Sequence, residues 1–119
     1  MHYLSTRGYA ALSDSSVSFS EILLGGLAPD GGLFLPKAYP QVTGEELNAW
    51  RTLSYADLAF EVLRKFATDI PEADLKAITH KTYTADVYKN ARSDESAQTI
   101  TPLRVLEDKG GRKLVLQAL

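Results

Sequence analysis

Apolar residues recur at helical spacing in several parts of the chain, and the clearest pattern lies within residues 55–66. Its apolar positions follow the order i, i+3, i+4, i+7, i+8 and i+11, which places them on one face of an amphipathic helix. Weaker patterns predict a short helix that begins at Phe19, a brief one after Thr43 and a longer one after Pro71. The side chains expected to enter the core from the main helix are Tyr55, Leu58, Ala59, Val62, Leu63 and Phe66.

Polar residues mark where three of these helices begin. Ser18 with Glu21 and Thr43 with Glu46 each fit a capping box, in which two side chains bond amides of the first turn reciprocally. Ser54 is expected to cap the main helix. Local signals therefore predict the starts of these helices.

The helical periodicity also predicts two side-chain arrangements. The helix after Thr43 is expected to turn Leu47 and Trp50 inward. On the exposed face of the main helix, Glu61 and Lys65 are four residues apart, so we expect them to form an ion pair.

Glycine and proline residues predict a tight corner after the first helix. The Gly25-Gly26 pair is expected to end that helix, because glycine takes the left-handed conformation at little cost. Pro29-Asp30-Gly31 then predicts a turn, with a positive φ at Gly31 or at Gly32. The glycine pairs do not form a phosphate-binding loop, because neither the G-x-G-x-x-G nor the Walker pattern is present.

Short strands are predicted toward both ends of the chain. Residues 3–6 carry β-prone side chains, and Leu33-Phe34-Leu35 is expected to form a short buried strand that stops at Pro36. Residues 99–106 and 112–119 predict a hairpin joined by a glycine turn. The expected fold class is therefore α+β, mostly helical with a few short strands.

The second strand of this hairpin predicts an interaction between copies of the chain. Residues 114–119 are strongly apolar and β-prone, and an exposed strand edge favours pairing with another chain. We expect self-association through this segment; the alternative is that the hairpin with residues 100–106 buries it within one monomer. Residues 90–98, which precede the hairpin, are polar and predict a loop.

Length and composition narrow the class of protein. The 119 residues suffice for one domain that spans residues 1–119. A net charge of −2 and a pI near 5.6 argue against a nucleic-acid partner. The sequence contains no cysteine, no secretory signal and no run of about 20 apolar residues, so we expect a cytoplasmic protein without disulfides or membrane contact.

Several short segments follow one another along the chain in an order and at a spacing that are typical of one protein family. They are Tyr3-Leu4-Ser5-Thr6-Arg7-Gly8, Phe19 with Glu21-Ile22-Leu23-Leu24, residues 26–36, residues 54–66 and Ile100-Thr101-Pro102-Leu103. Taken together, these segments resemble the N-terminal region of threonine synthase. The resemblance extends over nearly the whole chain.

The resemblance implies a pyridoxal-phosphate-dependent enzyme of fold type II that converts O-phospho-L-homoserine and water to L-threonine and phosphate. In that family the cofactor is bound by a lysine in a Pro-Thr-x-x-Phe-Lys-Asp context, which this sequence lacks. We therefore expect that lysine in the remaining domains of the same enzyme, against which this region would pack. The chain alone is expected to bind no pyridoxal phosphate covalently and to be inactive. Its seven lysines are Lys37, Lys65, Lys76, Lys81, Lys89, Lys109 and Lys113.

Arg7 and Asp30 are the candidate residues adjacent to the substrate. Each lies beside a glycine within a family-like segment, where the backbone can approach a ligand closely. The structural alternative is that Arg7 pairs with a carboxylate and that Asp30 caps the turn. His2 and His80 are isolated in the sequence, so no metal site is expected.

Two other functions remain open on the sequence alone. Proteins similar to threonine synthase can be phospho-lyases that eliminate phosphate without forming threonine, and this region would not separate the two activities. The chain could also be a free-standing interaction module that has no catalytic role. The reading frame beyond Leu119 would distinguish an enzyme from such a module.

Overall fold

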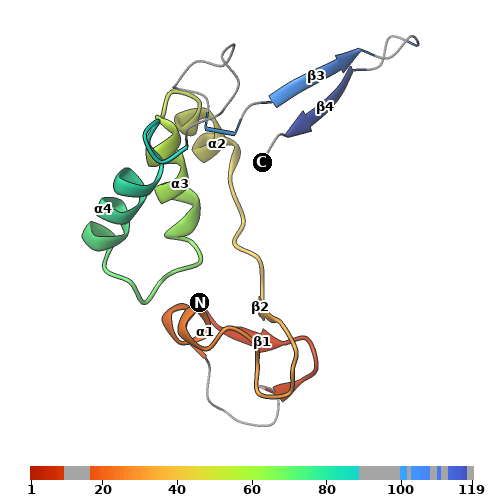
Figure 1. Cartoon of the computed structure of the whole chain (residues 1–119), viewed down its shortest axis with the longest axis vertical. Coiled ribbons are helices and arrows are strands. Elements are labelled where there is room, and N and C mark those ends of the chain that lie inside the picture. Colours follow the sequence, from red (N-terminus) through yellow and green to blue (C-terminus); the bar gives the residue numbers. More distant parts are fainter. Residues whose placement is uncertain (10–16, 89–99, 102, 108–109, 111–112, 118–119) are drawn as a thin grey trace. The chain divides into compact units, whose positions relative to one another are not determined.

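The computed structural model describes residues 1–9, 17–88, 100–101, 103–107, 110 and 113–117 (Figure 1). The chain forms two compact units, residues 1–81 and residues 82–119. The fold is α+β, with four helices and two antiparallel strand pairs among the described residues, which confirms the expected class. That residues 1–119 act together as one domain stays a prediction. None of the described helices is long and apolar enough to cross a membrane.

The first unit begins with a two-stranded ribbon. Strand β1 (Tyr3–Ser5) pairs antiparallel with β2 (Phe34–Pro36), and Leu4 lies opposite Leu35. The predicted burial of the Leu33-Phe34-Leu35 segment is wrong for both leucines, which are exposed. Strand side chains alternate between faces, so Phe34 shares the inner face with β1's buried residues while the leucines lie on the outer face.

Helix α1 (Phe19–Gly25) connects the two strands. The predicted capping box is confirmed, because Ser18 Oγ accepts the Glu21 N–H while the Glu21 carboxylate accepts the Ser18 N–H at 2.8 Å. The Asp69 carboxylate accepts two further amides of the first turn, at 3.2 and 2.9 Å. The helix ends where predicted, at Gly26, whose φ is +72°.

Three more helices follow: α2 (Gly44–Trp50), α3 (Tyr55–Leu63) and α4 (Glu72–Thr82). The predicted caps are confirmed, because Thr43 Oγ1 and Ser54 Oγ each accept an amide from the first turn of their helix at 3.1 Å. The inward direction predicted for Leu47 is wrong; its side chain is exposed, and α2 contributes no buried residue to the core.

The core of the first unit is small, and the face of α3 that reaches it is only partly the predicted one: Leu63 packs on it as expected, but Phe60 was not predicted. Its buried cluster is Phe60, Ala67 and Leu75, so the side of α3 that carries Phe60 faces the core together with Leu75 of α4. Tyr55 and Val62, which the periodicity places inside, are at the surface. The position of α4, which the periodicity of α3 cannot indicate, selects the buried face. Partly buried side chains that pack on the cluster are Phe19, Leu63 and Ile70.

The second unit contains the end of α4 and a β-hairpin. Strand β3 (Leu103–Glu107) pairs antiparallel with β4 (Lys113–Gln117), which confirms the predicted hairpin. Val105 lies opposite Val115, and both side chains are exposed. The loop predicted at residues 90–98 lies outside the described residues.

Candidate functional site

The two candidate residues meet at the turn that leads into β2. The Gly31 N–H donates to the carbonyl of Ala28 at 2.8 Å, and the turn places Pro29 and Asp30 at its tip. The predicted positive φ is confirmed at Gly31, where it is +74°. The turn and the adjoining ends of the ribbon thus form a corner, which we call the Asp30 corner, comprising residues 5–9 and 28–33.

The Asp30 carboxylate is the centre of this corner. It accepts hydrogen bonds from Ser5 Oγ at 2.8 Å, from the Gly32 N–H at 2.9 Å and from the Tyr9 N–H at 3.0 Å. Partial desolvation raises the pKa of Asp30, but the bonds from Gly32, Ser5 and Tyr9 outweigh it, so the pKa lies below its usual value. Because the folded-state pKa is lowered, the carboxylate stabilises the fold at neutral pH and loses this effect as the pH falls through that pKa.

Arg7 contacts Asp30 through the backbone and not through the carboxylate. Its Nη1 donates to the main-chain carbonyl of Asp30 at 3.1 Å, and its side chain is exposed. Among the described residues, Arg7 forms no ion pair. Asp30 therefore stabilises the turn, as the structural alternative expected. The carboxylate that the same alternative expected beside Arg7 is not found in the part of the chain that the structure describes.

Ser5 is a hydrogen-bond partner of Asp30 that the sequence reasoning missed. Its side chain is buried on the inner face of β1, two residues after buried Tyr3. A side chain at Gly32 would collide with Ser5 Oγ and would lie 3.0 Å from Asp30 Oδ1 and 3.1 Å from Thr6 Oγ1. The available signal was a polar residue at a strand position whose period places it inside.

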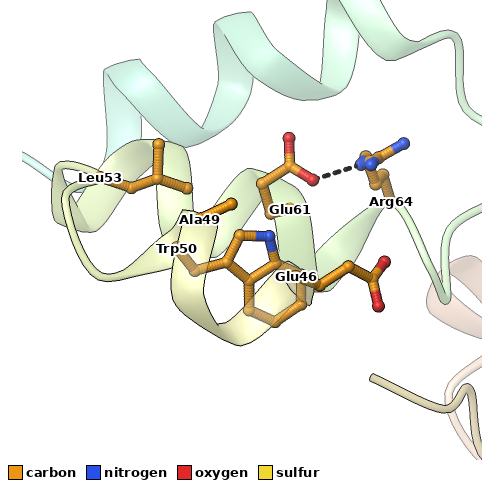
Figure 2. Close-up of a pocket in the computed structure, with 6 residues that line it drawn as sticks. All are labelled: Glu46, Ala49, Trp50, Leu53, Glu61 and Arg64. Atoms are coloured by element: carbon orange, nitrogen blue, oxygen red, sulfur yellow. Dashed lines mark hydrogen bonds and ion pairs between the residues drawn. The ribbon is translucent and has the colours of Figure 1, made fainter. Parts of the chain in front are cut away.

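An open pocket of about 290 Å³ lies on α2 and α3 (Figure 2). The sequence reasoning did not identify it. Trp50 presents its ring to the pocket, and Glu61 accepts from Arg64 Nε at 2.7 Å across one turn of helix. The lining residues are Glu46, Ala49, Trp50, Leu53, Glu61 and Arg64.

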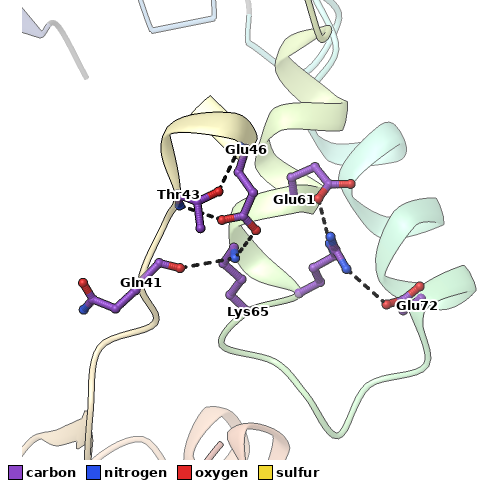
Figure 3. A network of polar contacts seen from close by, with 7 residues as sticks. Gln41, Thr43, Glu46, Glu61, Lys65 and Glu72 are labelled. Carbon is purple, nitrogen blue, oxygen red and sulfur yellow. Dashed lines mark hydrogen bonds and ion pairs between the residues drawn. The ribbon is translucent and has the colours of Figure 1, made fainter. Parts of the chain in front are cut away.

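A polar network fixes α2 against the end of α3 (Figure 3). Lys65 Nζ lies 2.6 Å from the Glu46 carboxylate, so the predicted pair between Glu61 and Lys65 is wrong. Each of the two side chains pairs with another residue instead: Glu61 with Arg64, and Lys65 with Glu46. The hydrogen bond from Lys65 is the main cause that lowers the pKa of Glu46, followed by the bond from the Thr43 amide.

The two histidines do not gather metal ligands in the described part of the chain. His80 Nε2 lies 2.9 Å from Asp57 Oδ1 at the surface. No group of three or more His, Asp or Glu side chains within the described ranges could hold a metal ion.

Comparison with known proteins identifies the family. Residues 2–83 match the family described as threonine synthase N terminus. The chain belongs to the threonine synthase family. The threonine synthase of Methylobacillus glycogenes is 54% identical over 108 residues, and that of Corynebacterium glutamicum is 46% identical over 112 residues. The resemblance stated from the sequence is confirmed.

The chain corresponds to only a small part of these threonine synthases. It aligns over 91% of its own length but over 22% of the Methylobacillus protein and 21% of the Corynebacterium protein. A crystal structure described as pyridoxal-phosphate-bound threonine synthase from Brucella melitensis matches with a TM-score of 0.68 and 36% identity. That match covers 87% of this chain and 20% of the Brucella threonine synthase.

The pocket on α2 and α3 does not fit the binding of pyridoxal phosphate. Lys65 lies beside the pocket, 5.8 Å from the centre of the Trp50 ring, but its ammonium group is bound by Glu46 and by the Gln41 carbonyl. The carboxylates of Glu46 and Glu61 line the same pocket and disfavour a phosphate group. Neither the pocket nor Lys65 therefore provides a site for the cofactor.

Proposed function

We propose that the chain is the N-terminal region of a cytoplasmic threonine synthase that converts O-phospho-L-homoserine and water to L-threonine and phosphate. The observation that supports this most directly is the family match over residues 2–83. The pyridoxal phosphate of the Brucella relative supports the same cofactor here, bound by domains beyond this region. This region then supplies no group to the covalent chemistry and packs on the domains that do.

Arg7 and Asp30 are proposed to lie next to the substrate in the whole enzyme. Arg7 is the better candidate for contact, because its guanidinium is exposed, oriented by a main-chain carbonyl and, within the described ranges, not paired with a carboxylate. Such a group binds the anionic phosphate of the substrate well. Asp30 acts as a positioning residue, because its carboxylate is occupied by Ser5, Gly32 and Tyr9.

The test is the activity of the polypeptide encoded by the complete reading frame that contains this chain. Purified with pyridoxal phosphate, it is expected to release phosphate from O-phospho-L-homoserine and to form threonine in equal amounts. Phosphate release without threonine would instead identify a phospho-lyase.

The 119-residue chain provides the matched control in the same assay. It is expected to release no more phosphate than a heat-treated sample and to retain no borohydride-fixable cofactor after dialysis. Activity of the short chain, or a reading frame that encodes no further domain, would contradict the proposal.

A further inference from the structure

The outer face of the β1–β2 ribbon is an apolar surface without a cover among the described residues. Leu4 and Leu35 lie directly opposite each other in the register, and Leu33 lies two residues before Leu35. Their exposed fractions are 36%, 46% and 61%. Since cross-strand partners and residues two apart share a face, the three leucines form one patch, which we call the leucine face.

The opposite side of the ribbon is already packed. Tyr3 is buried, its ring centroid is 6.2 Å from that of Phe19, and its hydroxyl donates to the Phe66 carbonyl at 3.0 Å. A ribbon of two strands is marginal on its own in water. The packed inner face therefore anchors the ribbon to the first unit and leaves the leucine face directed away from it.

The leucine face is held in a defined shape by the Asp30 corner. Thr6 and Leu33 exchange two hydrogen bonds, at 2.8 and 3.0 Å, which continue the ribbon beyond β1. The close approach of Gly32 to Ser5 and the bonds to Asp30 fix the start of β2. A surface ordered in advance loses less conformational entropy when it binds a partner.

We propose that the leucine face is the surface on which the remaining domains of the same enzyme pack. This inference rests on the proposed function. It is supported by the small fraction of each relative that this chain covers. Because the chain covers 20–22% of those proteins, about four-fifths of the enzyme lies outside it and must meet this region somewhere. An apolar patch of adjacent leucines is the kind of surface that a large intramolecular interface buries.

The contact uses the face of the ribbon and not its edge. In β2, Pro36 lacks an N–H group, so an added strand on that edge would lose a ladder bond. We therefore expect apolar side chains of the other domains to pack on the leucine face. No strand of those domains is expected to extend the β1–β2 ribbon.

The test measures the accessibility of single introduced cysteines. The 119-residue sequence contains no cysteine, so each variant carries one thiol in this region. Leu35→Cys is compared with Leu47→Cys in the whole enzyme, by alkylation followed by mass spectrometry of the peptides that carry the two positions. Leu47 is the control because it is 53% exposed and lies on α2 instead of the ribbon. Leu33→Cys provides a second position on the leucine face if the first variant does not fold.

Position 35 is expected to react at least about tenfold more slowly than position 47 in the native enzyme and equally fast in urea. Equal native rates would overturn the proposal, and so would protection that disappears on dilution, because a second copy would then be the cover. Activity of the parent enzyme is measured in parallel. An active enzyme with an accessible position 35 would disprove only the proposed packing on the leucine face. An inactive enzyme with a protected position 35 would disprove only the proposed reaction.

Discussion

At the scale of single residues, two neighbouring glycines of the Asp30 corner exclude a side chain for different reasons. Gly31 has a φ of +74°, a conformation that other residues adopt only with strain. Gly32 has no such φ, but a Cβ there would collide with Ser5 Oγ. The first glycine is required by the backbone and the second by the close approach of β1.

Substitution of these glycines by alanine is expected to destabilise the first unit. Gly31→Ala and Gly32→Ala should each lower the free energy of unfolding by roughly 1–3 kcal/mol, through backbone strain and through overpacking respectively. Gly44→Ala is the control, because a Cβ at Gly44 meets no atom within 4 Å and alanine favours the helix. Thermal unfolding followed by circular dichroism measures all three. Equal melting temperatures for the three variants would show that the corner has no special requirement for glycine.

The candidate site was predictable from sequence only where local chemistry defines it. Arg7 and Asp30 were found because each lies beside a glycine, and the structure brings them within 3.1 Å of each other. Ser5 was missed because its role depends on a hydrogen bond to Asp30, which lies 25 positions further along the chain. The direction of the Arg7 side chain, toward a carbonyl instead of a carboxylate, likewise depends on the folded turn.

At the scale of elements, the starts of helices were predictable and their buried faces were not. A cap such as Thr43 needs only residues three positions apart, so its signal is complete in the sequence. The buried face of α3 depends on α4, and Phe60 therefore lies inside where the periodicity selected Tyr55 and Val62. The leucines beside Phe34 illustrate the same limit, since only the packing of the ribbon decides which of its faces is covered.

The attachment of α2 to α3 is expected to depend on Glu46. Glu46→Gln removes the charge that meets Lys65 at 2.6 Å and weakens the capping box with Thr43. The variant should lower the melting temperature more than Glu45→Gln, a matched change at the neighbouring position, which forms no ion pair among the described residues. The difference should shrink in high salt, because screening weakens the ion pair. Identical melting curves for both variants would mean that the network does not stabilise α2.

At the scale of the whole molecule, the part of the chain that the structure describes buries few apolar side chains. The buried apolar residues of the described part are few, and three of them are alanines: Tyr3, Ala28, Ala56, Phe60, Ala67 and Leu75. Buried apolar side chains of this number and size provide limited stability to the described part of the chain. The remaining domains proposed above would supply the missing burial.

Separated from those domains, the 119-residue chain is expected to self-associate through its hairpin. Val105 and Val115 are opposite each other and each 57% exposed, and β3 and β4 form a two-stranded sheet with unpaired edges among the described residues. Sedimentation at several concentrations should show association that Val115→Lys weakens. Val87→Lys, a change at another exposed valine, should leave it unaltered. A monomer at every concentration would contradict this expectation.

The hydrogen bonds around Asp30 also set an order of events on the ribosome. The bonds that Tyr9 and Ser5 donate to its carboxylate span 21 and 25 positions, whereas the bond from Tyr3 to the Phe66 carbonyl spans 63 positions. Because nascent chains fold from the N-terminal side as they emerge, the corner can close before α3 has left the exit tunnel. The Tyr3 hydroxyl then reaches its acceptor only after the segment that carries Phe66 has left the exit tunnel.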